Sequence, residues 1–208
     1  MGIAGTVKNV NGGLGNLIEL VNKDPNKIWL DRERRTVTKR MGRKSSSGNK
    51  VHLPDDWFET YIRFQERTPY VVRIYKMTRS DEFTMEYLPN KGTVNEWLLE
   101  RKANGLGITR LESIHLIKTI MSIVTAGIEF SEKLGDGCLW IHGDLELHNI
   151  LVCSDGDDPM FKAIDPDSWW VWNNCNDIGL ANDQAIMKLG NCIKRINDMI
   201  STIPSILR

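Results

Sequence analysis

The chain has 208 residues, of which 41% are hydrophobic and 26% are charged. These values are typical of a soluble globular protein and exclude a disordered chain, a collagen and a coiled-coil rod. The 27 Lys and Arg residues balance the 27 Asp and Glu residues, so the formal net charge is zero. A chain without net charge is not a general nucleic-acid or membrane-surface binder, because such binding would need a local charged patch.

The sequence contains no apolar run of about 18 residues, so we expect no membrane-spanning helix. The N-terminus lacks the basic-then-apolar order of a secretory signal. The four cysteines are dispersed and form no Cys-x-x-Cys pair. These features predict a cytoplasmic protein with free thiols.

The first part of the chain predicts strands. Residues 1–16 are rich in Gly and Asn and are expected to form an N-terminal arm. Short apolar runs separated by turn residues over 17–41 predict a three-stranded antiparallel meander, in which 36–41 alternates and is β-branched. The Ser/Gly/Lys-rich stretch 42–50 has no hydrophobic period and is expected to be a loop.

A helix and two further strands are expected next. Pro54 opens a helix predicted over 54–66, and three aromatic residues at spacings of four and three form its apolar face: Trp57, Tyr61 and Phe64. Residues 70–77 and 82–88 predict two strands joined by a polar turn.

Two helices with clear signals follow. Thr93 and Glu96 have the spacing of a capping box, which predicts a helix over 94–102. The longest helical pattern covers 111–134, with apolar residues at helical spacing.

The remaining segments complete an α+β pattern. Two short apolar runs lie within 139–152, a strand is predicted over 160–164, and 183–200 is expected to be a closing helix. The order predicts a sheet-containing N-lobe over 17–87 and a mostly helical C-lobe over 88–208.

The segment with the strongest chemical signal begins near the middle of the C-lobe. Asp144 and Asn149 are five residues apart and directly precede an apolar strand, and Asp165 ends the next strand. If the two strands form a hairpin, Asn149 and Asp165 meet at its open end. An amide oxygen and a carboxylate suit Mg²⁺, a hard cation. Asp144 then remains to orient and deprotonate a hydroxyl, as phosphoryl transfer requires.

The sequence HGDLELHNIL at residues 142–151 resembles the catalytic loop of the protein-kinase-like superfamily. Its Gly143 makes it most similar to the aminoglycoside and choline phosphotransferase branch or to the small atypical kinases. Asp165 stands where the family has the aspartate of its Asp-Phe-Gly motif, with Pro166-Asp167 replacing Phe-Gly. The resemblance implies a two-lobe protein-kinase-like fold with a small antiparallel-sheet N-lobe and a minimal helical C-lobe.

The resemblance also implies residues that bind ATP. Lys39 matches the lysine that contacts the α- and β-phosphates. Glu59 matches its ion-pair partner, and Glu66 is the alternative. Glu86 and Leu88 lie in the expected hinge, where backbone groups bind adenine, and Met85 corresponds to the gatekeeper.

The implied activity is ATP- and Mg²⁺-dependent transfer of the γ-phosphoryl group to a hydroxyl acceptor, which is a small molecule or a protein. Three features depart from the family. No Gly-x-Gly-x-x-Gly loop is present, the first hairpin turn is expected over 22–27 with Pro25 inside it, and Glu146 replaces the lysine of Ser/Thr kinases. The alternative is therefore a catalytically weak pseudokinase that acts as a nucleotide- or protein-binding scaffold.

Other features admit two interpretations each. Nine Lys and Arg residues within 27–50 form either a solvated face or a site for an anionic ligand or protein partner. Trp169–Trp172 either packs on the C-lobe or lines a substrate site. His142 is expected to brace the loop, and His148 either is solvated or contacts substrate.

Overall fold

The computed structural model describes residues 17–23, 26–41, 55–135 and 139–172, together with the single positions Met187, Gly190 and Lys194; for 17–23, 26 and 170–172 only the backbone is described. The predicted arm 1–16 and loop 42–50 lie outside the described residues. So does the predicted helix 183–200, except that its three described positions are helical.

Contacts within the chain divide it into two compact units. The sheet unit comprises Met1–Arg63 and Arg73–Leu88, and the helical unit comprises Phe64–Val72 and Pro89–Arg208. The division after Leu88 lies one residue beyond the boundary expected from the sequence. The segment Phe64–Val72, expected in the N-lobe, belongs to the helical unit instead.

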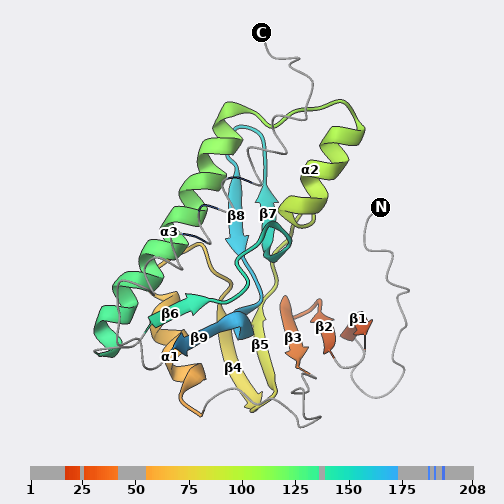
Figure 1. The fold of residues 1–208 in the computed structure, drawn as a ribbon. Helices are drawn as coiled ribbons and strands as arrows, with labels where there is room; N and C mark the ends of the chain where they lie inside the picture. Colours follow the sequence, from red (N-terminus) through yellow and green to blue (C-terminus); the bar gives the residue numbers. More distant parts are fainter. Residues whose placement is uncertain are drawn as a thin grey trace. The chain divides into compact units, whose positions relative to one another are not determined.

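The sheet unit contains a five-stranded antiparallel sheet in the order β1-β2-β3-β5-β4 (Figure 1). Its strands are β1 (Leu17–Lys23), β2 (Asn26–Asp31), β3 (Thr36–Arg40), β4 (Ile74–Arg79) and β5 (Glu82–Glu86). The predicted three-stranded meander is confirmed as β1, β2 and β3.

The predicted start of the fourth strand is wrong, because β4 begins at Ile74 and the backbone groups of Tyr70 and Val72 bond to Ala163 in β8 of the helical unit. The amide of Val72 donates to the carbonyl of Ala163 at 2.9 Å, and the amide of Ala163 donates to the carbonyl of Tyr70 at 2.7 Å. Backbone groups that are satisfied in this way are not available to extend β4.

Helix α1 (Trp57–Gln65) begins in the sheet unit and ends in the helical unit. Its aromatic side chains are buried as predicted, with exposed fractions of 0% for Tyr61 and Phe64. The ring of Trp57 lies 5.4 Å from that of Tyr61 and 5.8 Å from that of Phe83 on β5, which anchors the first turns of α1 in the sheet unit.

The helical unit is built on α2 (Val94–Ala103) and α3 (Arg110–Leu134). The predicted capping box of α2 is present, because Thr93 accepts from the Glu96 amide and Glu96 accepts from the Thr93 amide. Helix α3 starts with an equivalent pair, Thr109 and Glu112, which the sequence analysis did not use.

Helix α3 is long and apolar enough, by length and composition, to cross a membrane. Core helices of globular domains have the same composition, and α3 buries one full face, including Leu116, Ile120 and Ile123 at 0% exposure. Its packing is therefore that of a core helix.

Two two-stranded sheets complete the helical unit. Strand β6 (Leu139–His142) pairs antiparallel with β9 (Trp169–Trp172), and β7 (Ile150–Ser154) pairs antiparallel with β8 (Met160–Ala163). Short 3₁₀ turns, η1 (Leu147–Asn149) and η2 (Pro166–Ser168), precede β7 and β9. Strand β9 was not predicted as a strand.

An aromatic cluster forms the core of the helical unit. Trp169 lies 4.3 Å from Phe64 and 5.9 Å from Trp140, and Phe64 lies 5.5 Å from Phe130, all between ring centroids. Trp169 is 2% exposed. The packing interpretation of the tryptophan segment therefore holds for Trp169.

A charged network joins α2, α3 and the turn between β7 and β8. The guanidinium of Arg101 donates to both carboxylate oxygens of Glu112, at 2.8 and 2.9 Å, and Glu112 is 0% exposed. Asp155 accepts from Lys91 and from the indole of Trp97. The bond from Lys91 is the largest cause of a lowered Asp155 pKa, and the positive charges of Lys91 and Arg101 act in the same direction.

Candidate active site

The predicted catalytic segment forms two adjoining loops of the helical unit. Residues 143–149 connect β6 to β7, and residues 164–168 connect β8 to β9. Ile150 is paired with Ala163, and the Ile164 amide donates to the Asn149 carbonyl at 2.9 Å. The register therefore brings Asn149 together with Ile164, the residue next to Asp165, at the open end of the β7–β8 hairpin. The meeting of the Asn149 and Asp165 side chains stays a prediction.

Asn149 connects directly to Asp144. Its side-chain nitrogen Nδ2 donates to the Asp144 carbonyl oxygen at 2.8 Å and to the Asp144 Oδ2 at 2.9 Å. Both partners are acceptors, so the amide must direct its NH₂ group toward them. The amide oxygen Oδ1 then points elsewhere and is the atom of Asn149 that suits a cation. Asn149 is 8% exposed, so its orientation is held by packing as well.

His142 braces both loops, as expected. Its Nε2 lies 3.1 Å from the Ile164 carbonyl oxygen, and its Nδ1 lies 3.2 Å from the Asp144 amide nitrogen. A carbonyl only accepts and an amide N–H only donates, so these partners fit a neutral ring with the proton on Nε2. The side chain is 3% exposed. It therefore acts as a structural link between the loops and not as a group open to substrate.

Asp165 has a left-handed backbone, with φ 65° and ψ 56°. Few residues other than glycine adopt this conformation, although Asp tolerates it better than most. The Ser168 hydroxyl donates to Asp165 Oδ2 at 2.6 Å, and the Gly143 amide donates to the Ser168 carbonyl at 2.7 Å. Ser168 thus orients the Asp165 carboxylate and ties its loop to the loop of Asp144.

Ser168 is not among the site residues predicted from the sequence. Its position three residues after Asp165 is the spacing at which a hydroxyl reaches back to a preceding carboxylate in a tight turn. That spacing is the signal that identifies it.

Asp144 is accessible from solvent, with 52% of its side chain exposed. Its neighbours include His148, whose Nε2 lies 3.4 Å from Asp144 Oδ2 and whose Nδ1 lies 3.4 Å from Glu146 Oε2. His148 is thus both exposed and adjacent to Asp144. The three side chains offer ligand atoms within 4.8 Å of one another, but exposed groups of this kind are common without a metal ion.

Lys39 lies on β3, opposite Ile28 on β2 and Phe83 on β5. It is 8% exposed, so it is a buried lysine and not one that extends into solvent. Lysine is seldom buried to this degree without an electrostatic partner.

The expected ion pair between Lys39 and Glu59 is not among the contacts of the described residues. Glu59 is exposed, because α1 turns its aromatic face inward and Glu59 lies on the other side of the helix. The alternative, Glu66, is also exposed and follows α1 in the helical unit.

The expected hinge residues lie at the end of the sheet unit. Met85 on β5 is half-buried and packs against Leu30 and Val37. The Glu86 amide donates to the Arg73 carbonyl at 2.8 Å, so this N–H is used within the sheet. Leu88 is half-buried and is the last residue of the unit. The expected nucleotide contacts thus lie in one unit, and Asp144, Asn149 and Asp165 lie in the other.

The described part of the basic stretch is partly neutralised. Arg40 donates to Glu82 through Nε at 2.8 Å, and the Nε of the Arg34 guanidinium lies 3.8 Å from the Oδ2 of Asp31. Arg32 and Arg35 are exposed in the turn between β2 and β3. A role for this stretch in binding an anion remains a prediction.

No family model and no curated protein matches the sequence. Among solved structures, the chain is similar to one that contains the Rad53 kinase domain and SCD2, with a TM-score of 0.48 and 16% sequence identity. The alignment covers 87% of this chain, and the chain spans 64% of the length of that one. A likeness at this level does not carry an argument about function, so the proposal below depends on the chain's own residues.

Proposed function

We propose that the chain is an ATP- and Mg²⁺-dependent phosphotransferase that moves the γ-phosphoryl group to a hydroxyl acceptor. The observation that carries this proposal is the contact between Asn149 and Asp144. The buried Asn149 amide holds the half-exposed Asp144 carboxylate in place. The same hydrogen bonds direct the Asn149 Oδ1 away from Asp144.

Asp144 is proposed as the general base. Its Oδ2 is held by Asn149, whereas Oδ1 has no hydrogen bond among the described residues. In the reaction, the acceptor oxygen forms a bond to the γ-phosphorus and the bond from that phosphorus to ADP breaks, while the acceptor proton passes to Asp144. A correctly placed base of this kind contributes about 10²–10⁴-fold to a rate.

Asn149 and Asp165 are proposed to hold Mg²⁺. An amide oxygen and a carboxylate are ligands of the type that this cation prefers, so the donor set fits. The ion, when bound, supplies positive charge that neutralises the phosphates during transfer. Ser168 orients the Asp165 carboxylate before the ion arrives, which limits the reorganisation that binding requires.

The roles of Lys39 at the phosphates and of Met85, Glu86 and Leu88 at adenine remain part of the proposal. The burial of Lys39 supports a specific role for it. Because the Glu86 N–H is used by Arg73, a contact from Glu86 to adenine would be made by its carbonyl oxygen. The acceptor is a small molecule or a protein, and Glu146 in the loop argues against the ordinary Ser/Thr kinases.

One observation favours the alternative, a nucleotide- or protein-binding scaffold with weak catalysis. Lys23 on β1 pairs with Asn26 on β2, so only Asp24 and Pro25 lie between the strands. The expected turn over 22–27 is therefore shorter than predicted. Asp24 and Pro25 themselves lie outside the described residues. Because proline has no backbone N–H, the sequence between the strands offers few donors to phosphate.

The proposal is tested by phosphate transfer from radiolabelled ATP to pooled sugars, amino alcohols and basic proteins, using the full chain with and without Mg²⁺. We expect Asp144→Asn to lower transfer by about 10²–10⁴-fold. Asp157→Asn is the matched control, because Asp157 is exposed in the turn after β7 and outside the site. Unchanged transfer in the Asp144 variant would contradict the proposal.

A thermal-shift titration separates the enzyme from the scaffold. We expect ATP to stabilise the chain more with Mg²⁺ than without it, and Asp165→Asn to abolish the difference, because a ligand that binds the folded state raises its melting temperature. Metal-dependent stabilisation without any transfer would favour the scaffold. If ATP stabilises the chain equally with and without Mg²⁺, the proposed metal site is contradicted.

A further inference from the structure

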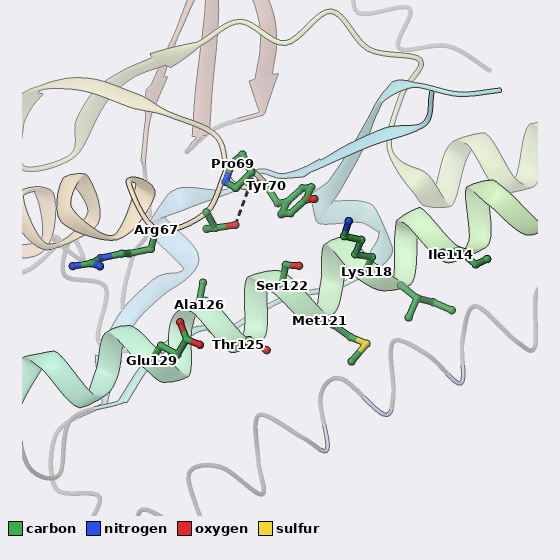
Figure 2. A pocket seen from close by; sticks show the side chains of 12 residues that line it. Arg67, Pro69, Tyr70, Ile114, Lys118, Met121, Ser122, Thr125, Ala126 and Glu129 are labelled. Carbon is green, nitrogen blue, oxygen red and sulfur yellow. Dashed lines mark hydrogen bonds between the residues drawn. The ribbon is translucent and has the colours of Figure 1, made fainter. Parts of the chain in front are cut away.

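The helical unit also has a groove whose lining includes no residue of the two loops. This groove of about 770 Å³ runs along α3 beside the segment of residues 67–70 (Figure 2). Its volume is within the range of about 300–1,000 Å³ that is typical of sites for small organic ligands. The proposed phosphotransferase activity does not use it.

The floor and one rim of the groove are apolar. Ile114, Ile117 and Met121 line it from α3, and Pro69 faces them from the other side. Ile114 and Met121 are 50% and 49% exposed, and Leu111, one turn before them, is 41% exposed. At spacings of three and seven, these residues share one face of the helix. An apolar stripe left open to solvent in this way is typical of a binding surface.

Hydrogen-bond donors gather on one side of this stripe. Lys118 and Ser122 are one turn apart on α3, so their side chains lie on the same face, and Tyr70 adjoins them from the opposite wall. Figure 2 shows the Lys118 side chain directed toward the Tyr70 side of the groove. Among the described residues, none of these three side chains has a hydrogen bond or an ion pair.

The charge near these donors is positive. Glu129 is the acidic residue of the lining, and it lies eleven residues beyond Lys118 on α3, which corresponds to about 16 Å along the helix. That separation exceeds the Debye length of about 8 Å at physiological salt, so Glu129 does not neutralise Lys118. Arg67, which also lines the groove, adds positive charge and points away from the other lining side chains (Figure 2).

We propose that this groove binds a long-chain carboxylate. Its carboxylate accepts hydrogen bonds from Lys118, Tyr70 and Ser122, and its alkyl chain covers Ile117 and Met121. The lining from Ile114 to Ala126 extends for about 18 Å along α3, and this elongated shape suits an extended chain. Burying apolar surface provides most of the binding free energy, and the cationic side chain selects the acidic head group.

Calorimetric titration of the full chain with dodecanoate below its micellar concentration tests the proposal. Lys118→Gln and Met121→Asp are each expected to weaken binding at least tenfold. Lys133→Gln is the matched control, because Lys133 is exposed on the same helix outside the groove, and it is expected to change affinity less than twofold. Both test positions are exposed, and circular dichroism melting verifies that the variants fold.

Two further probes determine the chemistry of the ligand. Dodecyltrimethylammonium has the same chain with a positive head, and butanoate has the same head with a short chain; both are expected to bind at least tenfold more weakly than dodecanoate. Equal binding of the cation, or unchanged dodecanoate binding by Lys118→Gln, would overturn the proposal. Binding of an acidic amphipathic peptide without any binding of dodecanoate would also overturn it. Titration requires no ATP, so its result is independent of the phosphotransferase proposal.

Discussion

Asn149 and its neighbours show what single side chains decide in this protein. The two acceptors on Asp144 determine which end of the Asn149 amide is available to a cation, and the Ser168 hydroxyl determines the orientation of Asp165. These contacts are short, local and specific. The effect of a single substitution on stability therefore depends on the contacts of that residue as well as on its type.

Gly127 on α3 is one such position. A Cβ atom there would lie 2.8 Å from the Trp140 carbonyl oxygen and 3.3 Å from the Trp169 ring. Alanine is favoured over glycine in helices by about 1 kcal/mol. Nevertheless, we expect Gly127→Ala to destabilise the chain by about 1–3 kcal/mol, because backbone and a packed ring cannot move easily. Urea denaturation measures the change, and Thr125→Ala at an exposed position of the same helix is the control; a stabilised Gly127→Ala would show that the cluster is loosely packed.

The contribution of Asp155 to the stability of the folded chain is expected to depend on pH. Its pKa is lowered in the folded state, chiefly by the bond from Lys91. A lowered folded-state pKa means that the contribution is complete above the unfolded pKa of about 3.9 and is lost as the pH falls through the folded value. We expect Asp155→Asn to cost about 1 kcal/mol at pH 7 and the difference from wild type to shrink below about pH 4.

Denaturant titrations at several pH values measure this dependence. Asp157→Asn, two residues away and exposed, is the control variant in the same titrations. If the difference in unfolding free energy between wild type and Asp155→Asn stays constant down to pH 2, the bond from Lys91 does not lower the Asp155 pKa.

At the scale of elements, local signals identify the helices well. The capping box of α2 was expected from Thr93 and Glu96, and α3 carries the same signal at Thr109 and Glu112. In α3 the capping residue Glu112 has a second role, because its carboxylate also accepts hydrogen bonds from the Arg101 guanidinium and from the Gly156 amide. The start of α3 is therefore linked to α2 and to the turn between β7 and β8.

Thr109→Ala is expected to lower the free energy of unfolding by about 1 kcal/mol, because the Glu112 amide loses its acceptor. Thr109→Ser retains the hydroxyl and is expected to lose less than half of that. Chemical denaturation measures both variants. Equal losses would indicate that the methyl group, and not the cap, is responsible.

Strands were harder to predict than helices. Residues 70–72 have the composition of a strand, yet the backbone bonds of Tyr70 and Val72 go to Ala163 and not to the five-stranded sheet. Strand β9 pairs with β6, which precedes it by about 30 residues, and in this pairing His142 lies opposite Trp169. Strand formation depends on a partner that is distant in the sequence, whereas helix formation depends on neighbours.

At the scale of the whole molecule, the two units have separate cores. The sheet unit buries Trp57, Tyr61 and Phe83 around the first turns of α1, and the helical unit buries its own aromatic cluster. Helix α1 contributes to both units, because Phe64 at its end belongs to the second cluster. Local stability is therefore expected to differ between the units.

Phe64→Ala tests this division. Removing a fully buried phenylalanine is expected to cost about 3–5 kcal/mol. Hydrogen exchange is expected to accelerate at the amides of α3 and β6 more than at those of β3 and β5. Equal acceleration in both units would show that they unfold as one cooperative body.

The sequence by itself determined α1, α2 and α3, the first meander and the spacing of Asp144, Asn149 and Asp165, because hydrophobic period, capping residues and short loops act between near neighbours. Only the tertiary structure decided that Lys39 is buried, that Glu59 is exposed, that Trp169 is a core residue and that α3 carries an open groove. Each of these depends on which distant segment covers which face. Packing over the whole unit determines which segments come together, and a local sequence pattern does not contain this information.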